Sequence, residues 1–130
     1  MTTTLIIDDD ERLCDSVKRS LERSGGFSVR VATSGEQGVE LALECAPDII
    51  ILDLMMPRMT GADVAAKLRA MPQTARIPVV YLTGLIGKAD AAALGGVIDG
   101  ERYVAKPASV EELLEVIERT LGEVHARGGV

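Results

Sequence analysis

Apolar and polar positions along this chain alternate between short aliphatic runs and longer stretches with helical spacing. Five of the short runs are strand-like, and they cover residues 4–7, 27–31, 49–52, 79–82 and 103–105. The run Ile49–Leu52 is unbroken, which is typical of a strand that is covered on both faces. In contrast, Phe27, Val29 and Val31 alternate with polar residues, as expected for a half-exposed strand.

Amphipathic stretches separate these runs. Their apolar residues recur at intervals of three and four, and they cover residues 11–23, 34–46, 60–70 and 109–121, with a weakly patterned, alanine-rich stretch over residues 87–96. Ser34 with Gln37, and Ser109 with Glu112, have the spacing of a capping box, which marks a helix start. Pro47 predicts the end of the second helix. Five helices are therefore expected, the fourth being short.

Strand and helix alternate five times, which predicts a parallel sheet with helices on both faces. The expected fold class is α/β, a three-layer (βα)5 doubly wound sheet. The chain has 130 residues, the usual size of one domain. Residues 1–124 are expected to form that domain, with residues 125–130 as a disordered tail. In such sheets, ligands bind beyond the carboxyl ends of the strands, where the strand order reverses.

Charge and composition narrow the range of partners. The formal net charge is −6, from 14 basic and 20 acidic residues, which argues against non-specific binding to nucleic acid or to an anionic membrane. No apolar run approaches the roughly 20 residues that cross a bilayer, and the start of the chain lacks the basic segment of a signal peptide. We therefore expect a cytoplasmic protein. Cys14 and Cys45 have no metal-binding spacing and are expected to be reduced thiols.

Polar residues follow the predicted strands at their carboxyl ends. Asp8 and Asp9 follow the first strand, Asp53 the third, Thr83 the fourth and Lys106 the fifth. Taken alone, each of these residues also has a simpler structural explanation. Asp9 or its neighbour Asp10 could cap the first helix, the threonine could belong to a turn, and the lysine could be solvated. Together they are expected to meet at one edge of the sheet.

The chemistry of this set suits phosphoryl transfer. Several carboxylates at one edge repel each other and favour a hard divalent cation such as Mg²⁺, which binds carboxylates, water and phosphate oxygens. A carboxylate can act as a covalent nucleophile toward phosphorus. The ammonium group of Lys106 and the hydroxyl of Thr83 could then stabilise the charge of the transferred group.

Four segments carry a resemblance to a known family: LIIDDDERL, PDIIILDLMMPRMTG, VVYLTG and YVAKPAS. The chain resembles the receiver domains of two-component response regulators over nearly its whole length. It looks like the stand-alone type, since nothing remains for an output domain. The resemblance implies a flavodoxin-like sheet with strand order 2-1-3-4-5.

The resemblance also implies roles for individual residues. It implies Asp53 as phosphoacceptor, Lys106 as its partner, and Thr83 with Tyr103 as the switch pair. Magnesium (or manganese) would be held by Asp8, Asp9, Asp53 and the backbone carbonyl of Met55. Met55 and Leu85 occupy the positions that tune dephosphorylation in the family. Because both are apolar here, a long-lived phosphorylated state is expected.

The partners implied by the resemblance are proteins. A histidine kinase or a histidine phosphotransfer protein would donate the phosphoryl group. A downstream target would bind the face formed by the fourth helix, fifth strand and fifth helix. We expect no nucleic-acid and no membrane partner, and a signalling phosphoacceptor domain that is not an enzyme with turnover.

Two other functions remain open at this point. One is a small magnesium-dependent phosphohydrolase with an aspartyl nucleophile. Such enzymes commonly need a second acid two residues after the nucleophile, and here that residue is Met55. The other is a scaffold that resembles a receiver and binds partners without phosphorylation, against which the complete set of polar residues argues.

Overall fold

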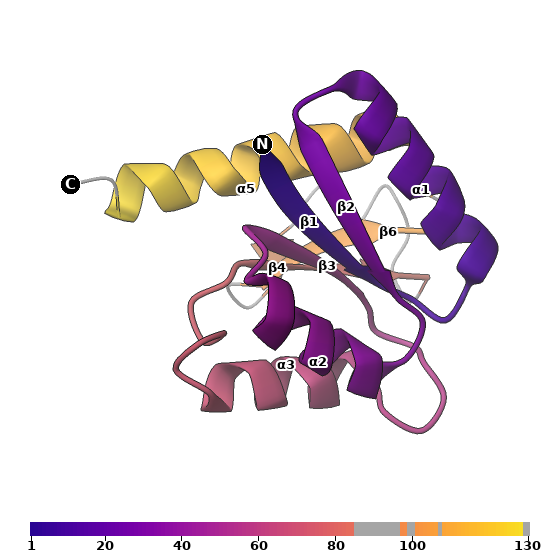
Figure 1. Cartoon of the computed structure of the whole chain (residues 1–130), viewed down its shortest axis with the longest axis vertical. Helices are drawn as coiled ribbons and strands as arrows, with labels where there is room; N and C mark the ends of the chain where they lie inside the picture. Colours follow the sequence, from indigo (N-terminus) through magenta and orange to yellow (C-terminus); the bar gives the residue numbers. More distant parts are fainter. Residues whose placement is uncertain (85–96, 99–100, 107, 129–130) are drawn as a thin grey trace.

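Strands and helices alternate along the chain as the sequence predicts (Figure 1). The computed structural model describes residues 1–84, 97–98, 101–106 and 108–128. The strands are β1 (Thr2–Ile7), β2 (Phe27–Ala32), β3 (Ile49–Asp53), β4 (Val79–Thr83), β5 (Val97–Ile98) and β6 (Glu101–Ala105). The helices are α1 (Glu11–Ser24), α2 (Gly35–Cys45), α3 (Gly61–Ala70) and α5 (Val110–Gly128). The helix expected over residues 87–96 lies outside the described residues.

The strands form one sheet in the order β2-β1-β3-β4-β6-β5. The first five strands in this order pair in parallel, which confirms the expected order 2-1-3-4-5, with β6 as the predicted fifth strand. β5 was not predicted. It has two residues and pairs antiparallel with β6 at the edge of the sheet, so it is too short to show an alternating pattern.

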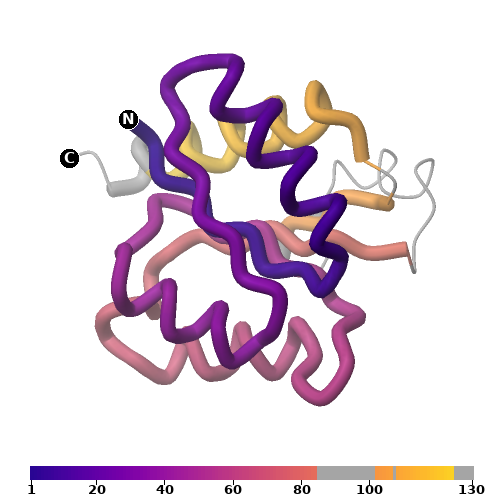
Figure 2. The backbone as a smooth tube through the Cα atoms, turned by 45° about the vertical axis from the view of Figure 1, so that its right-hand side comes forward, coloured from indigo at the N-terminus to yellow at the C-terminus, as the bar shows by residue number. Residues whose placement is uncertain are grey.

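Helices cover both faces of the sheet: α1 and α5 lie on one face, and α2 and α3 on the other (Figures 1 and 2). The side chains of consecutive β3 residues pack on alternate faces of the sheet. Ile49 and Ile51 pack in the core under α1 and α5, whereas Ile50 and Leu52 pack in the core under α2 and α3. All four are at most 1% exposed. The unbroken aliphatic run is thus explained by burial on both sides.

Both predicted capping pairs lie at helix starts, but the first is not a complete capping box, because the Gln37 side chain bonds to the residue before the N-cap Ser34. The Ser34 hydroxyl accepts a hydrogen bond from the Gln37 amide (3.2 Å), and the Gln37 side chain accepts one from the Thr33 amide (2.9 Å). At the start of α5, the amide of Glu112 donates to the Ser109 hydroxyl (3.1 Å), and the Ser109 amide donates to the Glu112 carboxylate (3.3 Å). These bonds satisfy amide groups that have no partner inside the helix.

The last helix, α5, runs to Gly128 and so continues beyond residue 124. The disorder expected for residues 125–130 stays a prediction. None of the helices in the described part of the chain has both the length and the apolar character that a membrane span requires.

Candidate functional site

The acidic residues meet where β1 and β3 end side by side. Ile7 of β1 pairs with Leu52 of β3, so Asp8 and Asp53, which follow them, lie at the same edge of the sheet. One carboxylate oxygen from each of Asp8, Asp9 and Asp53 lies within 4.8 Å of the others. Because β2 and β3 flank β1 on opposite sides, this edge is also where the strand order reverses.

Asp53 is nearly inaccessible, with 3% of its surface exposed. Its Oδ1 atom accepts a hydrogen bond from the Met55 amide (3.1 Å). The backbone next to it is also fixed, since the amide of Leu54 donates to the Leu82 carbonyl (3.1 Å) and the amide of Gly61 donates to the Leu54 carbonyl (3.0 Å). The carboxylate therefore projects from a backbone with little freedom to move.

Lys106, which directly follows β6, reaches the acidic residues. Its Nζ atom lies 2.9 Å from Oδ2 of Asp8 and 3.4 Å from Oδ1 of Asp53. Its backbone amide donates to the Thr83 carbonyl (2.8 Å), which ties the residue to the end of β4. The lysine predicted from the sequence is thus brought to the two buried carboxylates.

Thr83 ends β4 and is 1% exposed. It follows Leu82, the residue paired with Asp53, so its backbone adjoins the acidic edge. Side chains alternate along a strand, and Val80 and Leu82 face α1 and α5. Thr83 therefore belongs to the opposite face of the sheet.

Asp10 has a structural role. Its Oδ1 atom accepts a hydrogen bond from the Leu13 amide (3.1 Å) and caps α1. Its own amide donates to Oδ1 of Asp8 (3.0 Å), which orients that buried carboxylate. Helix capping, one of the simpler readings of this acidic segment, thus applies to Asp10, while Asp8 and Asp9 belong to the cluster.

The remaining predicted residues lie around this centre. Met55, two residues after Asp53, is 61% exposed. Tyr103 is half-buried on β6 and stacks on Tyr81 of β4. Leu85 lies outside the described residues.

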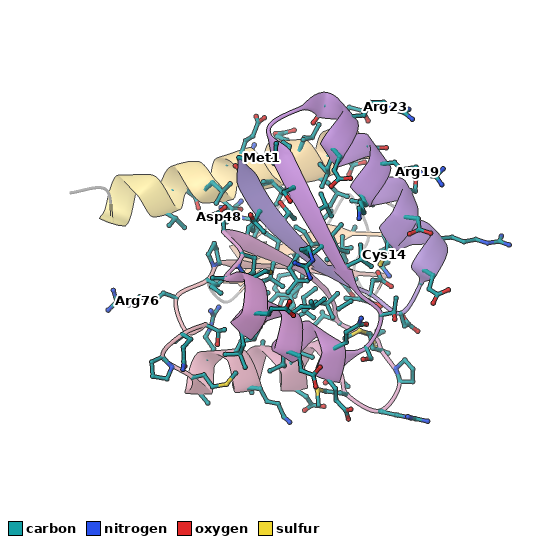
Figure 3. All side chains as sticks on the ribbon, in the orientation of Figure 1. Met1, Cys14, Arg19, Arg23, Asp48 and Arg76 are labelled. Carbon is teal, nitrogen blue, oxygen red and sulfur yellow. The ribbon has the colours of Figure 1, made fainter. Side chains whose placement is uncertain are left out.

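Sequence reasoning missed two residues that support the site. The backbone of Gly61 passes so close to Asp53 that a Cβ atom there would lie 2.5 Å from the Asp53 carbonyl oxygen. The Cys14 thiol donates a hydrogen bond to the Asp8 carbonyl (3.3 Å); Figure 3 shows Cys14 on the side of α1 that faces the sheet. The close approach of Gly61 could have been inferred from one feature of the sequence, a glycine directly after Thr60 at a predicted helix start.

Both cysteines are free, as predicted. Burial, with a smaller contribution from the nearby charge of Asp8, raises the pKa of the Cys14 thiol to about 12. Burial also raises the pKa of the Cys45 thiol. Thiols in this condition are protonated at neutral pH and behave as small apolar groups.

Charge at the site is unbalanced. Burial raises the pKa of Asp53 above its ordinary value; the charge of Asp8 adds to this rise, while the Met55 amide and Lys106 oppose it. Burial alone would lower the pKa of Lys106, but its hydrogen bonds and ion pairs with Asp8 and Asp53 outweigh burial and raise it. Among the described residues, three carboxylates thus face one ammonium group, and oxygen ligands with excess negative charge suit a hard divalent cation.

In metal-free buffer, Asp53→Asn is expected to have a higher free energy of unfolding than the wild type at neutral pH. The raised pKa means that folding favours protonated Asp53. That contribution is complete below the ordinary pKa of 3.8 and is lost as the pH rises through the raised value. The difference between the two proteins should therefore shrink toward about pH 4, as measured by urea unfolding with a chelator present. A difference that grew on acidification would contradict the raised pKa. Asp15→Asn, at an exposed position, is the control.

The comparisons with known proteins agree with this geometry. Residues 4–118 match the family described as the response regulator receiver domain. The DNA-binding dual master transcriptional regulator RpaA of Synechocystis is 40% identical over 121 residues, which are 93% of this chain and 49% of that protein. The transcriptional regulatory protein CpxR of Escherichia coli is 37% identical over 125 residues, 96% of this chain and 51% of that protein. The chain spans about half the length of these curated relatives.

Solved structures show the same fold. Chemotaxis protein CheY4 of Vibrio cholerae has a TM-score of 0.78 and 28% identity, covering 92% of this chain and 98% of that one. The receiver domain of the sensor histidine kinase PA1611 from Pseudomonas aeruginosa, described with magnesium coordinated in its active-site cleft, has a TM-score of 0.72 and 25% identity, covering 94% of this chain and 99% of that one. With the matched region spanning residues 4–118 and the acidic edge in place, the chain belongs to the response regulator receiver domain family.

Proposed function

We propose that the protein is a phosphorylation switch in which Asp53 accepts a phosphoryl group from the phosphohistidine of a histidine kinase or phosphotransfer protein. The observation that carries this proposal is the meeting of buried Asp53, buried Asp8 and the Lys106 ammonium group at one edge of the sheet. In this reading the chain is a signalling acceptor and performs no turnover on external substrates. Because the curated relatives are about twice as long, the stand-alone type and the absence of a nucleic-acid partner stay predictions.

The two oxygens of Asp53 are not equivalent. Oδ1 is held by the Met55 amide and lies near Lys106. Oδ2 has no such partner among the described residues, and we assign it the attack on phosphorus. A P–O bond then forms, the P–N bond to the donor's imidazole breaks, and its electron pair stays on that nitrogen. Lys106 and Thr83 stabilise the charge on the phosphoryl oxygens.

A divalent cation completes this site in our proposal. Asp8, Asp9, Asp53 and the Met55 carbonyl would hold Mg²⁺ or Mn²⁺. The buried carboxylates fit such an ion, since the one ammonium group that the described part of the chain brings to them cannot balance their charge. When bound, the cation supplies charge stabilisation for the phosphoryl group.

In this proposal, Thr83 and Tyr103 transmit phosphorylation of Asp53 to the surface that binds a protein target. A phosphoryl group on Asp53 would draw the Thr83 hydroxyl toward it and open space for the Tyr103 ring. The face near β6 and α5 would then shift between two states and bind a protein target differently in each. The helix expected to share this face lies outside the described residues.

The test is labelling of the protein with acetyl phosphate and Mg²⁺, read by intact mass. We expect one phosphoryl group on the wild type, none on Asp53→Asn and none with a chelator. Asp15→Asn, which removes an exposed carboxylate outside the cluster, should label like the wild type. A wild type that never labels would favour the scaffold function, and continuous phosphate release from small phosphoesters would favour a phosphohydrolase.

The phosphorylated state is expected to decay faster in Met55→Asn than in the wild type. The exposed methionine beside Asp53 cannot hydrogen-bond an attacking water, whereas an amide can orient one. We expect acceleration of roughly tenfold, below the 10²–10⁴-fold range for a positioned general acid or base, because an amide orients the water without taking its proton. Loss of labelled mass after donor removal measures the decay. Leu85→Glu is the second variant, and unchanged decay in both would contradict the expected slowing of dephosphorylation by the two apolar residues.

A further inference from the structure

We propose that Tyr81 is a positioning residue that holds Tyr103 away from Thr83 in the unphosphorylated protein. The inference rests on the proposed function, in which Tyr103 and Thr83 act as the switch. It adds a residue that the sequence motifs do not single out, and it explains what keeps the switch in its resting position.

The two tyrosines form a stacked pair. Their ring centroids are 5.1 Å apart, with an angle of 27° between the ring planes. Tyr81 and Tyr103 are directly paired in β4 and β6, so their side chains leave the same face of the sheet. Tyr81 is 6% exposed and belongs to the core under α2 and α3, whereas Tyr103 is half-buried at its margin. Tyr81 is therefore the fixed member of the pair and Tyr103 the movable one.

The switch threonine lies on that same face. Thr83 is two residues beyond Tyr81 in β4, and side chains at this spacing point to one side of a sheet. Its direct partner in β6 is Ala105, which is two residues beyond Tyr103 and 4% exposed. On this face of β6 a large ring is thus followed by a single methyl group. A Tyr103 ring that leaves the stack can pass over that methyl group toward Thr83.

The Tyr103 ring can therefore contact either Tyr81 or Thr83, which lie on the same face of the sheet. Stacking on Tyr81 favours the observed position, and movement toward Thr83 requires the stack to be given up. Aromatic pairs of this geometry change an equilibrium by about 2- to 12-fold beyond the effect of burial. The stack with Tyr81 thus determines how strongly phosphorylation of Asp53 must favour a second position of the Tyr103 ring, near Thr83, before the switch moves.

The experiment compares Tyr81→Leu, which removes the stacking ring, with Tyr81→Phe, which keeps it. Nuclear Overhauser contacts from the Tyr103 ring to the Thr83 and Ala105 methyl groups report the second position. In untreated protein we expect these contacts to strengthen about 2- to 12-fold in Tyr81→Leu and to stay at the wild-type level in Tyr81→Phe. By linkage, the apparent affinity for beryllofluoride with Mg²⁺ should rise by a similar factor only in Tyr81→Leu.

Val79→Ala provides the matched control, since it removes buried apolar volume from the same face of β4 and leaves the aromatic pair. Equal contacts in Tyr81→Leu and Tyr81→Phe, or the same increase in Val79→Ala, would overturn the inference. Labelling of Asp53 by acetyl phosphate is measured on the same samples. A wild type that is not phosphorylated at Asp53 would contradict the proposed function. The nuclear Overhauser contacts of the Tyr103 ring in untreated protein would still test the role of Tyr81.

Discussion

Replacing Lys106 by methionine is expected to lower the free energy of unfolding by about 2–4 kcal/mol at neutral pH in metal-free buffer. The Lys106 ammonium group lies 2.9 Å from Oδ2 of Asp8 and 3.4 Å from Oδ1 of Asp53. Asp8 is 0% and Asp53 3% exposed, so removing the cation leaves two buried carboxylates that repel each other. Because the lysine side chain itself is 29% exposed, we place the effect below the upper limit for a fully buried pair.

Urea unfolding measures this effect, and a second substitution separates charge from packing. Adding Asp8→Asn to Lys106→Met removes one of the two uncompensated charges and should recover part of the lost stability. Mg²⁺ should also recover part of it, because a bound cation compensates the same carboxylates. Lys67→Met, at an exposed position of α3, is the control and should change stability little. An unchanged unfolding midpoint in Lys106→Met would show that the two ion pairs contribute nothing to stability.

The second large effect is expected for Gly61→Ala. The added Cβ atom would lie 2.5 Å from the Asp53 carbonyl oxygen and 2.8 Å from the Leu54 Cα atom. Both are backbone atoms, so no flexible side chain can move to make room. We expect a loss of about 1–3 kcal/mol in the free energy of unfolding, as for other overpacked sites. Displacement of Asp53 should also slow labelling by acetyl phosphate by roughly 10- to 100-fold.

Gly122→Ala is the matched control for this prediction. Gly122 also lies in a helix, α5, but a Cβ atom there would have nothing within 4 Å. Alanine is favoured over glycine in an open helical position, so this variant should gain up to about 1 kcal/mol and label normally. Opposite signs for the two substitutions would support the close approach at Asp53. A gain of stability in Gly61→Ala would contradict it.

The sheet could be predicted because its strands leave strong periodic signals. An unbroken run such as Ile49–Leu52 can be buried on both faces only in a central parallel strand, and α2 and α3 face α1 and α5 across it. Weaker signals were missed. The start of α3 is a capping box between Thr60 and Asp63, where aspartate takes the place of the usual longer acid. β5 has two residues and depends on its partner strand for its conformation.

The members of the site could be predicted, but not how they contact one another. Strand order alone places Asp8 and Asp53 at one edge, because parallel strands end together there. Which carboxylate Lys106 approaches more closely depends on packing between β6 and β1, which are not adjacent strands. The close contact of Gly61 with the Asp53 backbone depends likewise on the path of a connection between elements. Contacts of this kind leave no periodic pattern in a sequence.

The stacked tyrosines also determine how the protein can be observed. The chain has two tyrosines and no tryptophan, so the aromatic pair supplies its entire tyrosine signal. Near-ultraviolet circular dichroism and intrinsic emission excited near the tyrosine absorption band therefore report the packing of these rings without any attached dye. Separation of the rings in solution would change both spectra, and ordinary optical spectroscopy could follow it in real time.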